Sequence, residues 1–252
     1  MTSLRLNTCA FLASLLAACS GHSNGTGSPD AAPDTVPDSA VNPGGGNNSG
    51  TGTSTLVVNG SAVASPAINN SGDPANFTTD LLVRVTLGST DVTTGTVSIQ
   101  SSGGTIPLIY DAGTMRWHGA QAGYFQVYTL DVVSGTDAVH GVRVDGPDIH
   151  TFSAPTAGAS VNSTMNLPVS WARSEMADTA SLRTRLLNTI TISDTGTYSL
   201  PAGSLRSRPA QTENERLDLS RTDRITPAGA AAGSSFEVTV GNSIDVVVQP
   251  TM

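Results

Sequence analysis

The segment DLLVRVTLGSTDVTTGTVSIQS, residues 80–101, contains two apolar runs separated by turn-forming residues. In the first run Leu81, Val83, Val85 and Leu87 alternate with their neighbours, which is the two-residue period of a strand with one buried face. The second run, GTVSIQS, follows a stretch of Ser, Thr, Asp and Gly. A strand, a turn and a strand at this spacing are typical of a β-sandwich.

The same pattern continues along the rest of the chain, and no segment has a convincing helical periodicity. Over Ser174–Leu187 a short helix is the alternative, and we favour a strand over its second half. The segments 128–137 and 236–245 share an aromatic-to-Asp pattern that either two copies of one strand-and-turn type or chance would produce. Strands are predicted at 55–58, 80–88, 95–101, 106–111, 115–119, 124–133 and 138–145 and, after a break at 150–162, at 165–172, 181–187, 189–193, 197–203, 216–222, 236–241 and 243–249.

The second set of strands resembles a known class of modules. SAPTAGASVNSTMNLPVSWA, residues 153–172, resembles the opening of immunoglobulin-like and fibronectin III-like modules of bacterial surface proteins, and DTGTYSLPAGSL, residues 194–205, resembles a later strand and corner. The resemblance implies an all-β fold of two tandem immunoglobulin-like β-sandwich domains, at 55–152 and 153–252. It also implies that Trp171 is the core tryptophan of the second domain, although the cysteine pair of antibody domains is absent.

The first nineteen residues, MTSLRLNTCAFLASLLAAC, have the layout of an export signal: Arg5 near the start and an apolar run that ends in small residues. The ending LAAC resembles the bacterial lipobox. This resemblance implies a signal peptide at 1–18, cleavage before Cys19 and a diacylglycerol on the Cys19 sulfur; a secretory signal with a chance cysteine is the alternative. Ser20 stands where an inner-membrane retention signal usually has Asp, so an outer membrane lipoprotein facing the periplasm or the cell surface is expected.

The segment after Cys19 is rich in Gly, Pro, Ser and Asp and has almost no large apolar residue. Such a composition cannot bury enough surface to offset the entropy of ordering, so we expect residues 19–54 to be the lipidated cysteine and a disordered tether. GHSNG, residues 21–25, matches the G-x-S-x-G pattern of serine hydrolases. Ser23 lacks the strand before it and the helix after it that a nucleophile elbow needs, so it is not a catalytic candidate.

Composition excludes several function classes. The 12 basic residues are all arginine and face 20 acidic ones, so the net charge of −8 argues against nucleic-acid binding. The absence of lysine excludes P-loop, protein-kinase, pyridoxal-phosphate and S-x-x-K chemistry. Only Cys9 and Cys19 occur, so the chain after cleavage has no disulfide, thiol nucleophile or cysteine zinc site. No cofactor is predicted.

Few residues suggest a site. The aromatic residues Trp117, Tyr124 and Tyr128 are a speculative platform for sugar rings, and use in the sandwich cores is the alternative. Each polar candidate also has an ordinary structural explanation, so no catalytic or metal-binding residue is predicted. These candidates are His118, His140 and His150 for zinc, Asp73, Asp80, Asp145 and Asp148 for calcium, and Glu213 with Glu215 or Asp218 with Asp223 as glycosidase acids.

The sequence therefore predicts a non-enzymatic, lipid-anchored envelope protein that displays β-sandwich domains for adhesion or for contact with another envelope protein. Loops or an exposed strand edge are expected to carry the binding. The expected partners are the membrane, through the anchor, and an envelope protein or a polysaccharide. A carbohydrate-binding module, an unrecognised envelope hydrolase and a pure spacer remain as alternatives.

Overall fold

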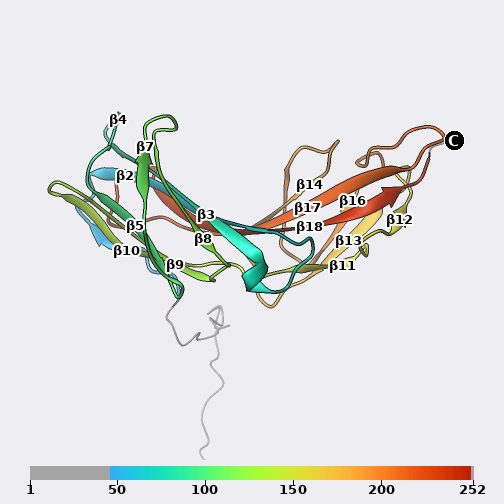
Figure 1. The fold of residues 1–252 in the computed structure, drawn as a ribbon, viewed down its shortest axis with the longest axis horizontal. Helices are drawn as coiled ribbons and strands as arrows, with labels where there is room; N and C mark the ends of the chain where they lie inside the picture. Colours follow the sequence, from blue (N-terminus) through green and yellow to red (C-terminus); the bar gives the residue numbers. More distant parts are fainter. Residues whose placement is uncertain (1–45, 251–252) are drawn as a thin grey trace, which may run out of the picture. The chain divides into compact units, whose positions relative to one another are not determined.

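The structure is a computed structural model and describes residues 46–250, which all belong to one compact unit. These residues form eighteen β-strands and one short 3-10 helix, η1 (Pro74–Asn76), so the predicted all-β class is confirmed (Figure 1). None of them belongs to a helix that is long and apolar enough to span a membrane. The predicted signal peptide, Cys19 and the tether up to residue 45 lie outside the described residues.

A ten-stranded sheet runs the length of this unit. Its strands pair antiparallel except where β18 meets β2 and β12, with which it runs parallel. The order is β15 (Ile190–Ile192), β14 (Thr179–Arg183), β17 (Glu213–Ile225), β18 (Ser235–Val248), β2 (Leu56–Pro66), β3 (Phe77–Leu87), β8 (Arg116–Ala122) and β7 (Ile109–Asp111), with β12 (Ser160–Val161) beside β18 and β4 (Thr90–Asp91) beside β3.

Two smaller sheets pack against this large sheet through two apolar cores. The first core lies between a five-stranded sheet and strands β2, β3 and β8, and the second lies between a three-stranded sheet and strands β14 and β17. The five-stranded sheet has the order β1 (Thr51–Gly52), β10 (Asp137–Asp145), β9 (Val127–Ser134), β5 (Thr96–Ser101) and β6 (Gly104–Pro107), and the three-stranded sheet has the order β11 (Thr151–Ala154), β13 (Leu167–Ala172) and β16 (Thr197–Leu200).

Strand β18 belongs to both cores. Its first half supplies Phe236, Val238 and Val240 to the first core, and its second half supplies Ile244, Val246 and Val248 to the second. All six side chains have the same parity, and the register with β17 is unbroken, so they project from one face of the sheet. Both smaller sheets therefore lie on the same side of the ten-stranded sheet, as Figure 1 shows.

The continuity of β18 corrects the prediction of two strands at 236–241 and 243–249. It also shows that the shared pattern of 128–137 and 236–245 is not a structural repeat. Gly135 adopts a φ of 62° in the turn between β9 and β10, whereas Gly241 stays extended within β18. A glycine next to a polar residue thus lies in a turn in segment 128–137 and in the interior of a strand in segment 236–245.

Most other predicted strands are confirmed with shifted ends. β14 (Thr179–Arg183) overlaps the first three residues of the strand predicted at 181–187, where a strand was favoured over a helix, and it ends four residues earlier than predicted. The predicted break at 150–162 contains β11 and β12, which the sequence analysis missed. Trp171 is buried in the second core, as the family resemblance implies. The domain boundary after residue 152 stays a prediction, since the first core also takes three residues from β18.

The end of the predicted tether is part of the folded unit. Strand β1 pairs with β10, and the amide of Ser54 donates to the carbonyl of Gly229 at 2.9 Å. The packing is so close that a Cβ on Gly52 would lie 2.4 Å from the carbonyl oxygens of Ala138 and Gly229. The prediction that the tether extends to residue 54 is therefore wrong for residues 51–54. The composition of this segment indicates disorder, but its pairing with distant strands orders it.

Candidate functional site

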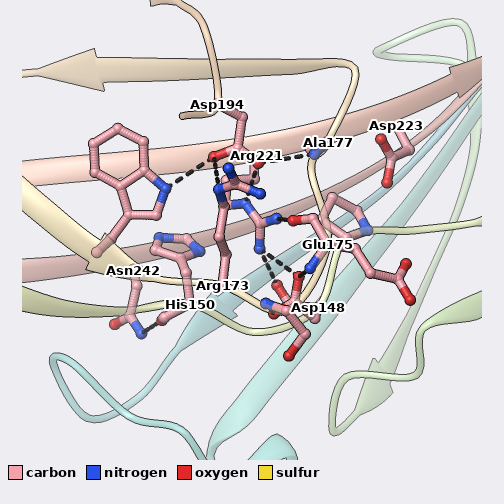
Figure 2. Close-up of polar contacts among 12 residues, drawn as sticks. Asp148, His150, Arg173, Glu175, Ala177, Asp194, Arg221, Asp223 and Asn242 are labelled. Atoms are coloured by element: carbon pink, nitrogen blue, oxygen red, sulfur yellow. Dashed lines mark hydrogen bonds and ion pairs between the residues drawn. The ribbon is translucent and has the colours of Figure 1, made fainter. Parts of the chain in front are cut away.

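A buried polar junction lies where the two cores meet (Figure 2); we define it as Arg221, Asp194, Asp148, His150 and Asn242. On β17, Arg221 follows Leu217 and Leu219 on the core-facing side, so its guanidinium is fully buried. Its Nε donates to Asp194 Oδ2 at 2.9 Å and its Nη1 to Asp148 Oδ1 at 2.8 Å. The remaining Nη2 donates to the backbone carbonyl of Glu175.

Asp194 connects three parts of the second half of the chain. Its carboxylate accepts hydrogen bonds from Trp171 Nε1 on β13, from the Ala177 amide and from Arg221, at 2.8, 2.8 and 2.9 Å. The Nε of Arg173 is a further cation, 4.0 Å away. The buried charge is thus matched by an opposite charge and saturated with donors, the condition under which a buried carboxylate is tolerated.

Asp148 lies between β10 and β11, in the segment that joins the strands of the five-stranded sheet to those of the three-stranded sheet. Burial on its own would raise the pKa of this carboxyl group, but hydrogen bonds from the Ser174 amide and from Arg221 outweigh burial and hold the pKa below its usual value. Asp148 is therefore ionised at neutral pH, and its charge faces the Arg221 guanidinium at 2.8 Å.

His150 and Asn242 complete the junction on the side of β18. Burial, reinforced by the charge of Arg221, lowers the pKa of His150 to about 4, so the ring is neutral at pH 7. Its Nε2 lies 3.1 Å from the Leu219 carbonyl, which requires the proton on Nε2. Asn242 donates to the carbonyls of Ser71 and His150 at 2.9 and 2.8 Å. Because its central groups are buried, we assign the junction a structural role.

The opposite face of the ten-stranded sheet is here called the open face; it is formed by the residues of β14, β17, β18, β2, β3 and β8 that alternate with the core-facing ones. Its central rows across β14, β17 and β18 are Ser181, Ser220 and Gly241, and Thr179, Thr222 and Thr239. These side chains are small and polar, and the two smaller sheets leave this face uncovered because both lie on the other side.

Two hollows of about 400 and 350 Å³ lie over β14, β17 and β18 on the open face, and a third, of about 770 Å³, adjoins them at the edge of β17 beyond the end of β14; all three are lined by Arg183 and Asp218. Asp218 accepts from two arginines: Arg183 Nη2 at 2.9 Å and Arg216 Nε at 3.0 Å. Both guanidinium groups are more than half exposed. This end of the open face therefore offers fixed hydrogen-bond donors beside a carboxylate.

A fourth hollow, of about 730 Å³, lies at the other end of the open face over β3, β7 and β8. Its lining combines the apolar side chains of Leu82 and Ile109 with the polar groups of Asp80, Arg116 and His118. Ile109 is 70% exposed, although it belongs to a strand. The two ends of the open face thus differ in chemistry, with charged and hydroxyl groups at one and a mixed apolar surface at the other.

The predicted aromatic platform is not a surface in this structure. Trp117, Tyr124 and Tyr128 belong to the first core and are at most 6% exposed. Trp117 Nε1 donates to the Val92 carbonyl at 3.0 Å, and the Tyr128 hydroxyl accepts from the Phe125 amide at 3.0 Å. A sugar platform needs an exposed ring face, so the platform hypothesis is corrected in favour of its alternative: the core uses these rings.

The polar candidates are also dispersed. Among residues 46–250 no group of three or more His, Cys, Asp or Glu side chains could hold a metal ion. Asp218 and Asp223 project from opposite faces of β17, which removes them as a pair of glycosidase acids. Glu213 and Glu215 share one face and are each within 4.0 Å of Arg185. The structure therefore brings together arginines and carboxylates rather than the histidines or the calcium candidates.

Sequence analysis missed Arg221, Asn242 and the arginines of the open face. A signal exists for the first two, since each interrupts an apolar alternation in phase with the core: Leu217, Leu219, then Arg221, and Val238, Val240, then Asn242. Comparisons of the chain with protein-family models, with curated proteins and with solved structures found no match.

Proposed function

We propose that this chain is a lipid-anchored cell-envelope protein that displays a non-catalytic binding surface. Its two cores would correspond to two immunoglobulin-like β-sandwiches that share β18, and the segment between Cys19 and residue 45 would be the tether. The proposed location is the outer membrane, with the folded unit facing the periplasm or the cell surface. The lipobox-like LAAC ending at Cys19 supports the anchor.

The observation that carries the binding function is the open face itself. In a two-layer sandwich one face of each sheet is buried, and here one sheet serves two sandwiches, so that the two smaller sheets leave its opposite face, eight strands across, uncovered. Small hydroxyl side chains at its centre and arginines at one end are suited to recognition by hydrogen bonding. We propose this face, in place of the loops and strand edges expected from sequence, as the binding surface.

The partner is proposed to be another envelope component, either a protein for adhesion or assembly or a polysaccharide. The central rows of the open face hold Ser, Thr and Gly and lack the large aromatic or aliphatic anchors that dominate the binding energy of protein interfaces. This composition favours the polysaccharide, which is the second candidate and is developed below.

Crosslinking and capture of the tagged full chain from intact native cells tests the proposal. A Cys19→Ser variant serves as the unanchored control. We expect the unaltered chain to fractionate with the membrane and to enrich one envelope component that the control does not enrich. Equal fractionation of both forms with soluble protein would contradict the anchor, and the absence of any enriched component would contradict the binding function.

A further inference from the structure

Glu215 is a buried carboxylate with an unmet hydrogen-bonding requirement. It lies on the core-facing side of β17 and its side chain is fully buried. Its Oε1 accepts from the Arg185 amide at 2.6 Å, but its Oε2 is buried and has no hydrogen-bond donor among residues 46–250. The closest cation to Oε2 is Arg185 Nε, at 4.0 Å, which is beyond hydrogen-bonding distance. A buried carboxylate oxygen without a donor is uncommon and costly.

This carboxylate borders the hollow of about 770 Å³, here called the Glu215 hollow. The hollow lies where β14 leaves the sheet: Arg183 pairs with Asp218, and the chain then turns away over residues 184–189. Thr184 fixes this turn, because its hydroxyl donates to the Ser204 carbonyl at 2.6 Å and its amide to the Leu187 carbonyl at 3.1 Å. The departure of β14 exposes the edge of β17 beside Glu215.

The lining of the Glu215 hollow combines positively and negatively charged side chains. Three guanidinium groups, of Arg183, Arg185 and Arg216, stand with the carboxylates of Glu215 and Asp218, so the formal charges of the lining nearly cancel (three positive against two negative). An anionic ligand would meet both carboxylates, and a cationic ligand would meet three arginines. A neutral ligand that both donates and accepts hydrogen bonds avoids both conflicts.

We propose that the Glu215 hollow binds a neutral, polyhydroxylated sugar unit. A sugar hydroxyl donates a hydrogen bond to Glu215 Oε2, and neighbouring hydroxyl oxygens accept hydrogen bonds from the exposed guanidinium groups of Arg183 and Arg216. Leu187, which is partly buried against the second core, offers the C–H face of the ring an apolar contact. The volume lies in the range of ordinary small-ligand sites. This inference rests on the proposed binding function and names its ligand class.

The test is calorimetric titration of the acylated full chain, in a detergent without a sugar headgroup. The probes are maltotetraose, cellotetraose and N-acetylated chitotetraose, with tetragalacturonate and deacetylated chitotetraose as the charged counterparts. The decisive variant is Glu215→Gln, which keeps the side-chain volume but replaces an acceptor with a donor. Glu213→Gln is the matched control, since it removes the same charge from the same face of β17 outside the hollow's lining.

We expect a neutral probe to bind, with affinity reduced about tenfold or more by Glu215→Gln and unchanged within about twofold by Glu213→Gln. Arg183→Gln, at an exposed position where folding is not at risk, is also expected to weaken binding. Tighter binding of a charged probe, equal binding by the Glu215→Gln variant, or no binding of any neutral probe would overturn the inference. If the anchored chain nevertheless enriches an envelope component, the proposed function stands and only the sugar site is wrong.

Discussion

At the scale of single residues, the molecule places charge where its two cores meet. Arg221 and Asp194 are both fully buried in their side chains and lie 2.9 Å apart. Pairing at this distance offsets much of the cost of removing each charge from water, but the pair contributes little net stability compared with an apolar substitute. The free energy of unfolding falls much more when one partner is removed, because the other charge then stays buried without a counter-charge.

Replacing Arg221 with Met should therefore lower the free energy of unfolding of the full chain by about 3–5 kcal/mol, because Asp194 loses its counter-charge. Chemical denaturation followed by circular dichroism measures this loss. Arg183→Met is the control: that arginine pairs with Asp218 at the surface, and its loss should cost at most about 1 kcal/mol. Equal effects of the two substitutions would show that the junction carries no special energetic role.

Asp223, two residues after Arg221 on β17, makes the stability of the fold depend on pH. Burial, and then repulsion from Asp178, raise the pKa of Asp223 from 3.8 to about 6. Between these values the folded chain holds a proton that the unfolded chain has released, so the contribution of this group to stability is lost as the pH rises from about 4 to above 6.

Asp223→Asn should remove this loss while keeping an oxygen acceptor for the Asp178 amide. We expect the variant to be more stable than the unaltered chain by about 1–3 kcal/mol at pH 8 and equally stable at pH 4. Urea unfolding at the two pH values measures both differences. A variant that is less stable at pH 8 would mean that the ionised carboxylate is favourably placed.

At the scale of elements, alternation identified most strands but did not show how long they run. The apolar period of 236–240 and 244–248 is clear in the sequence, and Gly241 and Asn242 between them have the composition of a turn. The strand continues because β17 pairs with it throughout and because Asn242 satisfies two buried carbonyls across the junction. These long-range partners cannot be deduced from local sequence, which also explains why β1 was assigned to the tether.

A shared strand should make the two cores unfold together. Trp117→Phe leaves Trp171 as the only tryptophan, and it reports on the second core. In this background Val238→Ala, a cavity in the first core, should lower the unfolding midpoint seen by Trp171 fluorescence and cost about 1–3 kcal/mol. Val133→Ala, at an exposed position on β9, should leave the midpoint unchanged. If Val238→Ala leaves the unfolding midpoint seen by Trp171 fluorescence unchanged, the two cores unfold independently.

At the scale of the whole molecule, both smaller sheets pack on one side of the large sheet, and this arrangement creates the open face. The sequence predicted a display function carried by loops or a strand edge, with Trp117, Tyr124 and Tyr128 as a speculative sugar platform; the first core takes these three rings instead. It did not find Arg183, Arg216 or Glu215 as a group, because they meet only through the pairing of β14 with β17. Local patterns revealed the strands, whereas the proposed binding surface depends on their order.

Site-specific photocrosslinking in native cells tests the open face most directly. A photoreactive phenylalanine analogue is placed either at Thr222, in the centre of the open face, or at Gln100, an exposed position on β5 in the five-stranded sheet, with Cys19 intact in both chains. We expect illumination to join an envelope component to the chain substituted at Thr222 and not to the chain substituted at Gln100. Adducts formed from Gln100 alone, or equally from both positions, would contradict the assignment of binding to the open face.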